Sequence, residues 1–357
     1  MFIKKNKGKK KVAIGLSGGV DSSVAAYLLK EQGFEVVGVY MQCWDEKADG
    51  CVADVDRSFA VATAASLGIK FIHLDFKDRY KSKVIDYFYS EYEHGRTPNP
   101  DVLCNKEIKF GLFYDWALEK GYDFVATGHY ARVETGNNEI LLKRGIDESK
   151  DQSYFLYLLE QRHLEKVIFP VGNHTKAEIR EIAKNTNLPP AKRPESMGIC
   201  FIGEVDIKDF LKKRIEERKG EVIFKDGENI GEHDGVWFYT IGQRHGFRVN
   251  KYFGTPLYVL SKDMTRNTLT VGRYDDALSE AFEISDIHWI GKNYLSDCKD
   301  LKCDVRIRHL GEIINCNLVM IESGFRVELT KPVFAVAPGQ SAVFYKDDVV
   351  LGGGVIV

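Results

Sequence analysis

The sequence predicts an α/β domain with a Rossmann-like parallel sheet, followed by one or two small domains made mainly of β-strands. Two observations indicate this fold class. Strand-like and helix-like segments alternate as far as about Gly128, and the helical signal nearly vanishes from Glu221 onwards. The chain has 357 residues, of which 44% are hydrophobic and 12% aromatic. At ~150 residues per domain, this length favours two or three domains with enough apolar surface for a sizeable core.

Buried strands and amphipathic helices alternate in the first part of the chain. We expect strands at 11–16, 35–41, 69–75 and 122–127, and helices at 20–32, 55–67, 78–93 and 106–120. Strands that are joined through helices have right-handed crossovers, so the pattern predicts a parallel sheet covered by helices.

The pattern changes after this first part. We expect a hairpin around 136–138, helical stretches at 152–164 and 176–185, a loop with three prolines at 188–203, and a charged helix at 206–219. Short strands are predicted at 236–241, 257–261, 268–271 and 325–329, with a division between two small β domains near 282–286.

Composition excludes several classes of protein. The formal net charge is −2, so no global positive field indicates a nucleic-acid partner, and any such binding depends on local patches. The longest apolar runs, 36–41 and 333–337, are far shorter than the ~20 residues of a membrane helix. The lysine-rich start has no apolar segment typical of a secretory signal, and the seven cysteines contain no CxxC pair. We therefore expect a cytoplasmic protein in a reducing compartment.

The segment between the first strand and the first helix is rich in glycine and serine. Its residues are Gly15, Leu16, Ser17, Gly18, Gly19, Val20, Asp21, Ser22 and Ser23. The backbone N–H groups and the positive end of the following helix point at one spot, which predicts an anion site. The spacing fits neither a Walker A loop nor a Rossmann fingerprint. It resembles the SGGxDS pyrophosphate loop of enzymes that split ATP into AMP and pyrophosphate, although an ordinary glycine turn is the alternative.

In such a loop the glycines and Ser17, Ser22 and Ser23 would hold phosphate oxygens, and Asp21 would recruit a magnesium ion. ATP cleavage of this kind usually adenylates a poor electrophile, so that a nucleophile can displace AMP. The next question is which nucleophile the chain supplies.

Cys104 follows two prolines, Pro98 and Pro100, which disfavour a helix until just before Lys106. This spacing predicts a thiol at a helix N-terminus, where the dipole lowers its pKa and makes sulfur reactive. Asp101, three residues earlier, either transfers a proton or caps the helix. A buried, unreactive cysteine is the alternative for Cys104.

Cys200 follows the proline-rich loop, between Ile199 and Phe201. It is either a reactive thiol on a mobile segment or a strand residue in the core. The other five cysteines have no comparable setting and are interpreted as structural: Cys43, Cys51, Cys298, Cys303 and Cys316.

Taken together, these segments resemble the bacterial tRNA-specific 2-thiouridylases, the MnmA/TrmU family. The motifs that carry the resemblance are SGGVDSS (17–23), GRTPNPDVLCNKEIKF (95–110), ATGHYAR (126–132), KDQSYFLY (150–157), ESMGICFIG (195–203), TIGQRHG (240–246), VGRYDDAL (271–278) and APGQ (337–340). They occur in family order from residue 17 to residue 340, which is more specific than any one motif.

The resemblance implies a pyrophosphate-loop ATPase fold with a C-terminal β-barrel, divided as 1–205, 206–282 and 283–357. It implies ATP-dependent replacement of oxygen by sulfur at carbon 2 of the wobble uridine in tRNAs for lysine, glutamate and glutamine. Cys200 would receive a persulfide from a cysteine desulfurase or a sulfur-carrier protein. Cys104 would be the nucleophile and Asp101 the acid or base, and a disulfide between the two cysteines would form as a by-product.

The resemblance also assigns binding residues. For ATP these are Gly15 to Ser22, Met41 and Gly128, the last two at the carboxyl ends of predicted strands. For tRNA they are Asn99, Pro100 and Asp101 around the target base, and His129, Lys150, Asp151, Gln152, Arg308, His309 and Gln340 elsewhere. A flipped wobble base fits a deep site covered by loops.

One departure from the family bears on cofactors. Many relatives have cysteine at the position of Asp101, giving a CxxC pair that, with the distant cysteine, could hold an iron–sulfur cluster. With only Cys104 and Cys200 left of that triad, a persulfide relay is favoured, and a cluster with Asp101 as an oxygen ligand is the alternative. Two other functions compete: an AMP-forming amide ligase, which lacks a glutaminase-like domain here, and a tRNA-binding relative without chemistry.

Overall fold

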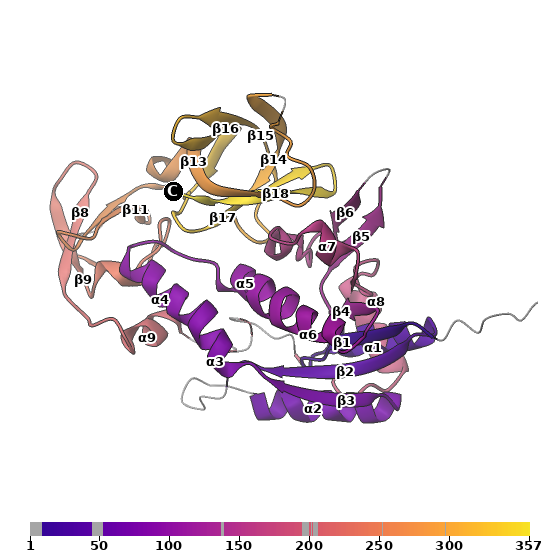
Figure 1. The fold of residues 1–357 in the computed structure, drawn as a ribbon. Helices are drawn as coiled ribbons and strands as arrows, with labels where there is room; N and C mark the ends of the chain where they lie inside the picture. Colours follow the sequence, from indigo (N-terminus) through magenta and orange to yellow (C-terminus); the bar gives the residue numbers. More distant parts are fainter. Residues whose placement is uncertain are drawn as a thin grey trace, which may run out of the picture. The chain divides into compact units, whose positions relative to one another are not determined.

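The computed structural model describes residues 9–44, 53–136, 139–194, 200, 202, 206–251, 253–296 and 298–357 (Figure 1). The chain forms two compact units. The first consists of residues 1–81, 101–204 and 348–350, and the second of residues 82–100, 205–347 and 351–357.

The first unit contains a five-stranded parallel sheet (Figure 1). Its strands, in spatial order, are β3 (Lys70–Asp75), β2 (Glu35–Gln42), β1 (Lys11–Gly15), β4 (Phe124–Ala126) and β7 (Val167–Ile168). From β1 the chain moves outward in one direction to β2 and β3, and later in the other direction to β4 and β7. The strand order therefore reverses at β1, and an open α/β sheet binds its ligands at such a point. The predicted Rossmann-like sheet is confirmed.

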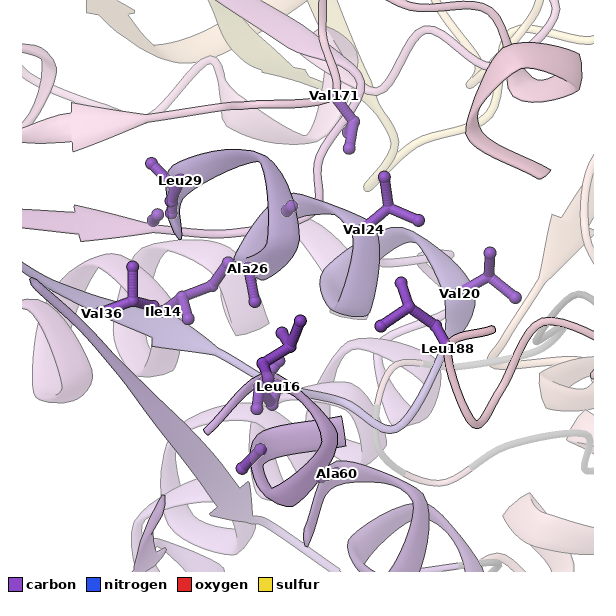
Figure 2. Close-up of a cluster of buried hydrophobic side chains, with 14 of the residues drawn as sticks. Ile14, Leu16, Val20, Val24, Ala26, Leu29, Val36, Ala60, Val171 and Leu188 are labelled. Carbon is purple, nitrogen blue, oxygen red and sulfur yellow. The ribbon is translucent and has the colours of Figure 1, made fainter. Parts of the chain in front are cut away.

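Apolar side chains of β1 and α1 (Val20–Glu31) form the core of this unit (Figure 2). Ile14 and Leu16 come from the first strand and its end, and Val24 and Leu29 from the inner face of the helix; each is at most 1% exposed. The helix α2 (Ala53–Leu67) adds Ala60 on the other side of Leu16. This packing fixes where β1 ends, and so fixes the start of the glycine loop.

Some of the remaining helices of this unit begin where local signals place them, and others do not. The helix α8 (Lys176–Asn185) starts after Thr175, which forms a capping box with Glu178. The region predicted as one helix at 152–164 is instead two short pieces, η4 (Ser153–Leu156) and α7 (Gln161–Leu164).

The helix that carries Cys104 starts earlier than predicted. It runs from α5 (Pro100–Leu103) through η3 (Cys104–Leu112) to α6 (Phe113–Glu119). Pro100 is its first residue, a position where a helix tolerates proline because no N–H is needed there. The expectation that Cys104 sits at a helix N-terminus is therefore wrong. Cys104 instead opens a π-helical stretch, whose wider turn is closed at its end by a hydrogen bond from Phe113 N–H to the Ile108 carbonyl.

The region predicted as a helix at 78–93 is also divided. It consists of α3 (Lys77–Tyr80), the π-helical η2 (Lys81–Ile85) and α4 (Asp86–Glu93), and the boundary between the two units passes through it. The expected hairpin is present as the antiparallel pair β5 (Ala131–Thr135) and β6 (Ile140–Arg144), although residues 137 and 138 of its turn lie outside the described residues.

The second unit contains a mixed five-stranded sheet. Its spatial order is β10 (Arg248–Val249), β9 (Asn229–His233), β8 (Gly220–Phe224), β12 (Thr268–Gly272) and β11 (Tyr258–Asp263). The charged helix expected at 206–219 is shorter than predicted, as α9 (Ile207–Lys212), with Asp206 as its cap. The prediction of a strand at 236–241 is wrong, because Val236–Phe238 forms the 3-10 turn η5.

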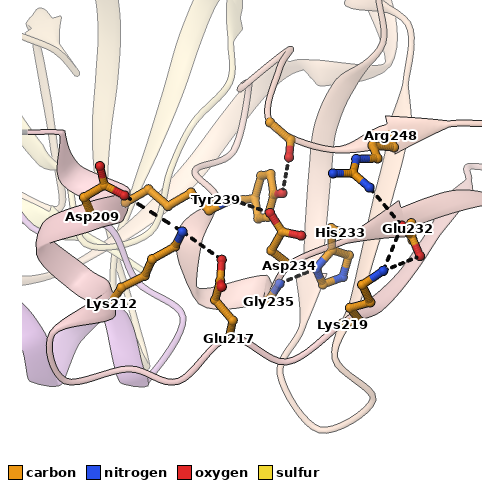
Figure 3. A network of polar contacts seen from close by, with 12 residues as sticks. Asp209, Lys212, Glu217, Lys219, Glu232, His233, Asp234, Gly235, Tyr239 and Arg248 are labelled. Carbon is orange, nitrogen blue, oxygen red and sulfur yellow. Dashed lines mark hydrogen bonds and ion pairs between the residues drawn. The ribbon is translucent and has the colours of Figure 1, made fainter.

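Polar side chains tie this sheet to the segment before it (Figure 3). Glu232 pairs with Lys219 and Arg248, and the Gly235 N–H donates to Nδ1 of His233 over 3.0 Å. The imidazole Nε2 lies 3.2 Å from the Asn267 carbonyl, so it carries the proton. Burial lowers the pKa of His233, which keeps the ring neutral in this structural role.

The second unit also contains a closed six-stranded barrel. The strands follow the order β13 (Leu278–Trp289), β16 (Gly324–Phe334), β15 (Ile314–Ile321), β14 (Asp300–Arg306), β17 (Ser341–Lys346) and β18 (Val349–Ile356), and β13 pairs with β18 to close the ring. The predicted fold class, an α/β domain followed by two small β-rich parts with a C-terminal barrel, is confirmed. Across the described ranges, every helix is too short or too polar to cross a membrane.

We expect Leu29→Ala to lower the free energy of unfolding by about 2–5 kcal/mol, because Leu29 is completely buried and its loss leaves a cavity between α1 and the sheet. Val61→Ala is the matched control: Val61 is 45% exposed on α2, and its truncation should change stability by less than about 0.5 kcal/mol. Urea denaturation followed by circular dichroism measures both. Equal effects of the two substitutions would contradict this assignment of the core.

Candidate active site

The glycine loop occupies the carboxyl end of β1, and its shape is held by serine hydroxyls. The Ser22 hydroxyl accepts from the Ser17 N–H and donates to the Gly19 carbonyl, each over 3.2 Å. Ser23 donates to the Gly19 carbonyl over 2.9 Å and contacts the Thr63 hydroxyl at 3.0 Å. Ser23 is completely buried, so its hydroxyl supports the loop instead of facing an anion above it. The exposed Ser17 hydroxyl and the backbone N–H groups at the start of α1 remain as the groups that face outward.

Glycine is required at two positions around this loop. Gly18 has φ +78°, and a Cβ on it would lie 2.2 Å from the Asp56 carbonyl oxygen. A Cβ on Gly128 would lie 2.7 Å from the Ser22 nitrogen, so the end of β4 packs directly against the loop backbone. Met41, at the end of β2, packs on Gly15, with its methyl carbon 3.0 Å from where a Cβ would stand. The residues expected to contact adenosine, Met41 and Gly128, therefore lie beside the loop.

Two cations that the sequence analysis missed flank the loop. Lys176, the first residue of α8, places its Nζ 2.7 Å and 2.9 Å from the two carboxylate oxygens of Asp21. Arg193 donates to the Gly18 carbonyl over 3.0 Å and pairs with Asp56. Both come from segments more than 150 residues along the chain from the loop. Positive charge beside an anion site is what a polyphosphate requires.

The Asp21 carboxylate does not have the surroundings of a metal ligand. Lys176 bonds both oxygens, and Tyr130 donates its hydroxyl to Oδ1 over 2.8 Å. A magnesium ion is bound through oxygen ligands and repelled by an ammonium group at the same carboxylate. In this arrangement the Asp21 carboxylate is suited to pair with Lys176 and not to bind magnesium.

The two candidate cysteines and Asp101 come together in the first unit. The Asp101 carboxylate accepts from the Cys200 N–H over 3.0 Å, and Tyr80 donates its hydroxyl to the Cys200 carbonyl over 2.7 Å. These two bonds hold the backbone of Cys200 on both sides. Hydrogen bonding to the Cys104 thiol, together with burial, raises the pKa of the Cys200 thiol well above its usual range.

Lys109 is the basic group of this cluster, and no sequence signal pointed to it. Its Nζ lies 3.8 Å from the sulfur of Cys200 and 3.3 Å from Nε2 of His129. His129 is buried, its Nδ1 lies 2.7 Å from the Thr127 hydroxyl, and burial followed by the charge of Lys109 lowers its pKa well below the usual range. His129, expected to contact tRNA, is therefore a neutral ring held inside the protein that accepts from Lys109.

Cys43 belongs to the same neighbourhood. It follows the end of β2, is buried, and interacts electrostatically with Lys109 and Cys200. Burial raises the pKa of its thiol well above the usual range. Cys43, interpreted from the sequence as structural, is thus a buried cysteine beside this cluster, whereas Cys51 lies outside the described residues. Over the ranges that the structure describes, no group of three or more His, Cys, Asp or Glu side chains is arranged to hold a metal ion.

The other residues expected to contact tRNA lie in two places. In the first unit, Lys150, Asp151 and Gln152 form the turn after β6; Asp151 is completely buried and accepts from two backbone N–H groups, and Gln152 exchanges two hydrogen bonds with the backbone of Tyr130. These two side chains shape the turn. Lys150 is partly exposed, and it carries the one charge of the three that is not completely buried.

In the second unit, Gln340 donates to the carbonyls of Thr97 and Pro98, over 2.7 Å and 3.3 Å, so it lies next to Asn99 and Pro100. The guanidinium of Arg308 donates to the Ala335 carbonyl, and His309 beside it is partly buried. Within this unit the structure thus places Gln340 beside Thr97 and Pro98, and Arg308 beside His309.

Comparison with known protein families gives a consistent result along the whole chain. Residues 10–204 match the model described as tRNA methyl transferase HUP domain, residues 208–273 the tRNA methyl transferase PRC-barrel domain, and residues 279–356 the Aminomethyltransferase beta-barrel domain.

Curated relatives match over nearly their full length. The chain is 44% identical to a protein of Pseudoalteromonas translucida over 97% of both chains, and 44% identical to one of Proteus mirabilis over 98% of this chain and 97% of the other. It is 46% identical to one of Geobacillus kaustophilus over 98% and 95%. The first two are named tRNA-specific 2-thiouridylase MnmA, and the third tRNA-specific 2-thiouridylase MnmA 1.

Solved structures are similar over part of the chain. The U34-tRNA thiolase NcsA from Methanococcus maripaludis, with its 4Fe–4S cluster, matches with a TM-score of 0.36 and 25% identity over 57% of this chain and 66% of that one. NMN synthetase from Francisella tularensis matches with a TM-score of 0.32 and 16% identity over 54% and 68%.

We expect Gly18→Ala to weaken ATP binding by at least about tenfold, equivalent to about 1.4 kcal/mol, because the new Cβ forces the loop away from Asp56. Gly33→Ala is the matched control: Gly33 has a similar φ of +88° but open space around its Cβ position, so it has the same backbone strain without moving the loop. Isothermal titration with ATP measures both. Equal affinities of the two variants would contradict the role of this loop.

Proposed function

The chain belongs to the family of tRNA-specific 2-thiouridylases, and from that membership we propose that it replaces the carbon-2 oxygen of the wobble uridine in tRNA by sulfur. The reaction consumes ATP and uses a cysteine persulfide as the sulfur source. The single observation that supports this chemistry best is the hydrogen bond of 3.0 Å from the Cys200 N–H to the Asp101 carboxylate, which places Cys200 beside the helix that carries Cys104. A relay of sulfur between two cysteines needs this proximity.

Activation of the uridine comes first. The carbon-2 oxygen attacks the α-phosphorus of ATP, the bond to the β-phosphate breaks, and pyrophosphate leaves. The glycine loop of residues 15–22 binds the phosphates through backbone N–H groups, with Met41 and Gly128 beside the adenosine. Lys176 and Arg193 offset the negative charge of the polyphosphate. Magnesium enters with ATP, bound chiefly by the phosphates, because both oxygens of Asp21 are engaged by Lys176.

Sulfur loading uses Cys200. Its thiolate attacks the terminal sulfur of a donor persulfide, a new sulfur–sulfur bond forms, and the donor leaves as a thiolate. Cys200 is partly exposed and Cys104 is completely buried, which favours Cys200 as the acceptor from an external protein. We propose a cysteine desulfurase or a sulfur-carrier protein as the donor. The cytoplasm, a reducing compartment, keeps the described cysteines as the free thiols that this step needs.

Transfer to the tRNA uses Cys104. Its thiolate attacks the inner sulfur of the Cys200 persulfide, a disulfide between the two cysteines forms, and the terminal sulfur leaves with the electron pair. That sulfide attacks carbon 2 and displaces AMP. A reducing thiol then restores both cysteines. Asp101 holds Cys200 in place and acts as the acid or base of the transfer.

The tRNA surface follows the family's positions. We propose that Asn99, Pro100 and Asp101 line the pocket of the flipped base in tRNAs for lysine, glutamate and glutamine. The remaining proposed contacts are His129, Lys150, Asp151, Gln152, Arg308, His309 and Gln340; of these, the buried His129 and Asp151 act by shaping their loops. The corresponding division of the chain is 1–205, 206–282 and 283–357.

We expect the purified protein, given ATP, magnesium and a persulfide donor, to form 2-thiouridine in unmodified glutamate tRNA and to release AMP. Cys200→Ser should stop transfer from the donor but keep some activity with free sulfide, and Cys104→Ser should abolish multiple turnover. Cys298→Ser, an exposed cysteine outside the cluster, is the control and should keep full activity. Mass spectrometry of the wobble nucleoside is the measurement. Normal thiolation by both catalytic variants excludes the relay, and absence of 2-thiouridine with the wild type excludes the function.

We expect Arg308→Ala to weaken binding to all three tRNAs alike and to reduce the slope of log affinity against log salt by about one, because one phosphate contact is lost. Arg266→Ala, whose 83% exposed side chain is remote from the family's tRNA positions, is the control and should leave the slope unchanged. Filter binding between low and moderate salt measures both. A slope that is the same in the two variants would remove Arg308 from the tRNA surface.

A further inference from the structure

Among the residues that the structure describes, one ammonium group faces the two thiols at the site described above. Lys109 Nζ lies 3.8 Å from the Cys200 sulfur, at the distance of a hydrogen bond to sulfur, and 3.3 Å from Nε2 of His129. We propose that Lys109 is a catalytic residue whose positive charge stabilises negative sulfur at Cys200, both when Cys200 accepts sulfur and when the sulfide leaves it. This inference deepens the proposed function and rests on it.

The π-helical stretch brings Lys109 to this position. In an α-helix, residues five apart point about 140° away from each other, because each residue turns the helix by about 100°. In a π-helix the hydrogen bonds connect residues five apart, so the fifth residue lies one turn further on and near the same face. Cys104 and Lys109 are the first and sixth residues of η3. The wide turn therefore puts the ammonium on the face of the helix that carries the thiol.

The groups around Lys109 keep it charged. The neighbouring groups that can become negative are Cys43 after β2, Asp101 and Cys104 on the same helix as Lys109, and Cys200. The Tyr80 hydroxyl on α3 faces the same thiols and the same carboxylate. Burial by itself would lower the pKa of Lys109, but the neighbouring thiols and carboxylate outweigh it and raise that pKa. His129 adds no positive charge, because burial keeps it neutral, and it orients the ammonium by accepting from it.

A cation is needed here because the other groups oppose a thiolate. The hydrogen bond from Cys104, burial and the charge of Asp101 all raise the pKa of Cys200, and Lys109 acts in the opposite direction. Asp101 is fixed at this place, since it holds the Cys200 backbone. Lys109 therefore offsets a carboxylate that the positioning of Cys200 requires.

The same charge assists the release of sulfur. When Cys104 attacks the inner sulfur of the Cys200 persulfide, the Cys104–Cys200 bond forms, the bond to the terminal sulfur breaks, and the electron pair leaves as hydrosulfide. An ammonium beside Cys200 lowers the energy of that anion as it forms. No further reactant is needed, because the persulfide sulfur is already at the oxidation level of a disulfide.

The test titrates Cys200 alone. In a Cys104→Ser background, which removes coupled titration of the two thiols, the rate of alkylation of Cys200 by iodoacetamide is followed against pH by peptide mass spectrometry. We expect Lys109→Gln, which keeps a hydrogen-bond donor for His129, to raise the pH midpoint of Cys200 alkylation by at least about one unit. At neutral pH this corresponds to a reaction about tenfold slower. Lys109→Arg, which keeps the charge, should stay within about half a unit.

Lys262→Gln is the matched control for removing a buried lysine. Lys262 donates to the Tyr239 carbonyl over 2.8 Å, and burial lowers its pKa to about 8. Its replacement should leave the Cys200 midpoint unchanged. An unshifted midpoint in Lys109→Gln, or equal shifts in Lys109→Gln and Lys109→Arg, overturns the proposal.

A second measurement needs no Lys109 variant and remains decisive if Lys109→Gln fails to fold. Iodoacetate is negatively charged, whereas iodoacetamide is neutral. A cation beside Cys200 should therefore make the ratio of the iodoacetate rate to the iodoacetamide rate higher at Cys200 than at a free cysteine peptide. A relative rate equal to or below that of the peptide overturns the proposal. These readouts need no tRNA, so they are independent of the thiolation assay, whose failure would overturn the proposed function instead.

Discussion

The hydrogen bond from the Cys200 N–H to the Asp101 carboxylate is the contact on which the site depends. It joins two segments 99 residues apart, and the Tyr80 hydroxyl holds the same peptide from the other side. A carboxylate accepts an N–H strongly, whereas a thiol is a weak acceptor. Asp101 therefore does more than supply a negative charge. It provides a fixed anchor for the backbone of Cys200 on the helix that carries Cys104.

The negative charge of Asp101 has an electrostatic consequence. At two places in the first unit, the chain places a lysine beside a carboxylate and so offsets its charge. A carboxylate lies at the thiol pair and another, Asp21, at the phosphate loop, and each would repel the negative species that the reaction brings. Lys109 offsets the first and Lys176 the second. Local placement of single lysines thus produces two sites for anions in a chain whose formal net charge is −2.

The fold and the phosphate loop could be predicted because their signals are local. Strand and helix periods and the glycine spacing determine them within a few neighbouring residues. The position of Cys104 was misjudged because a proline before it was interpreted as excluding a helix, whereas Pro100 is the first helical residue. The sequence does not indicate that Lys109 lies near Cys104, because their alignment on one face depends on a π-helical turn, which the usual helical period does not predict. Lys176 and Arg193 reach the loop only through tertiary packing, and no spacing in the sequence indicates that.

In the proposed relay, the unequal exposure of the two cysteine residues favours one direction of sulfur flow. Cys104 is completely buried, so no external protein or reductant reaches its sulfur directly, whereas Cys200 is partly exposed. In the proposed relay, sulfur therefore enters at Cys200. After transfer, an external thiol attacks the disulfide at the sulfur of Cys200, and Cys104 is the leaving thiolate. The ammonium of Lys109 interacts with both sulfurs, so it favours this departure as it favours the loading. In the proposed relay, one cation beside both thiols therefore serves every step in which sulfur becomes an anion.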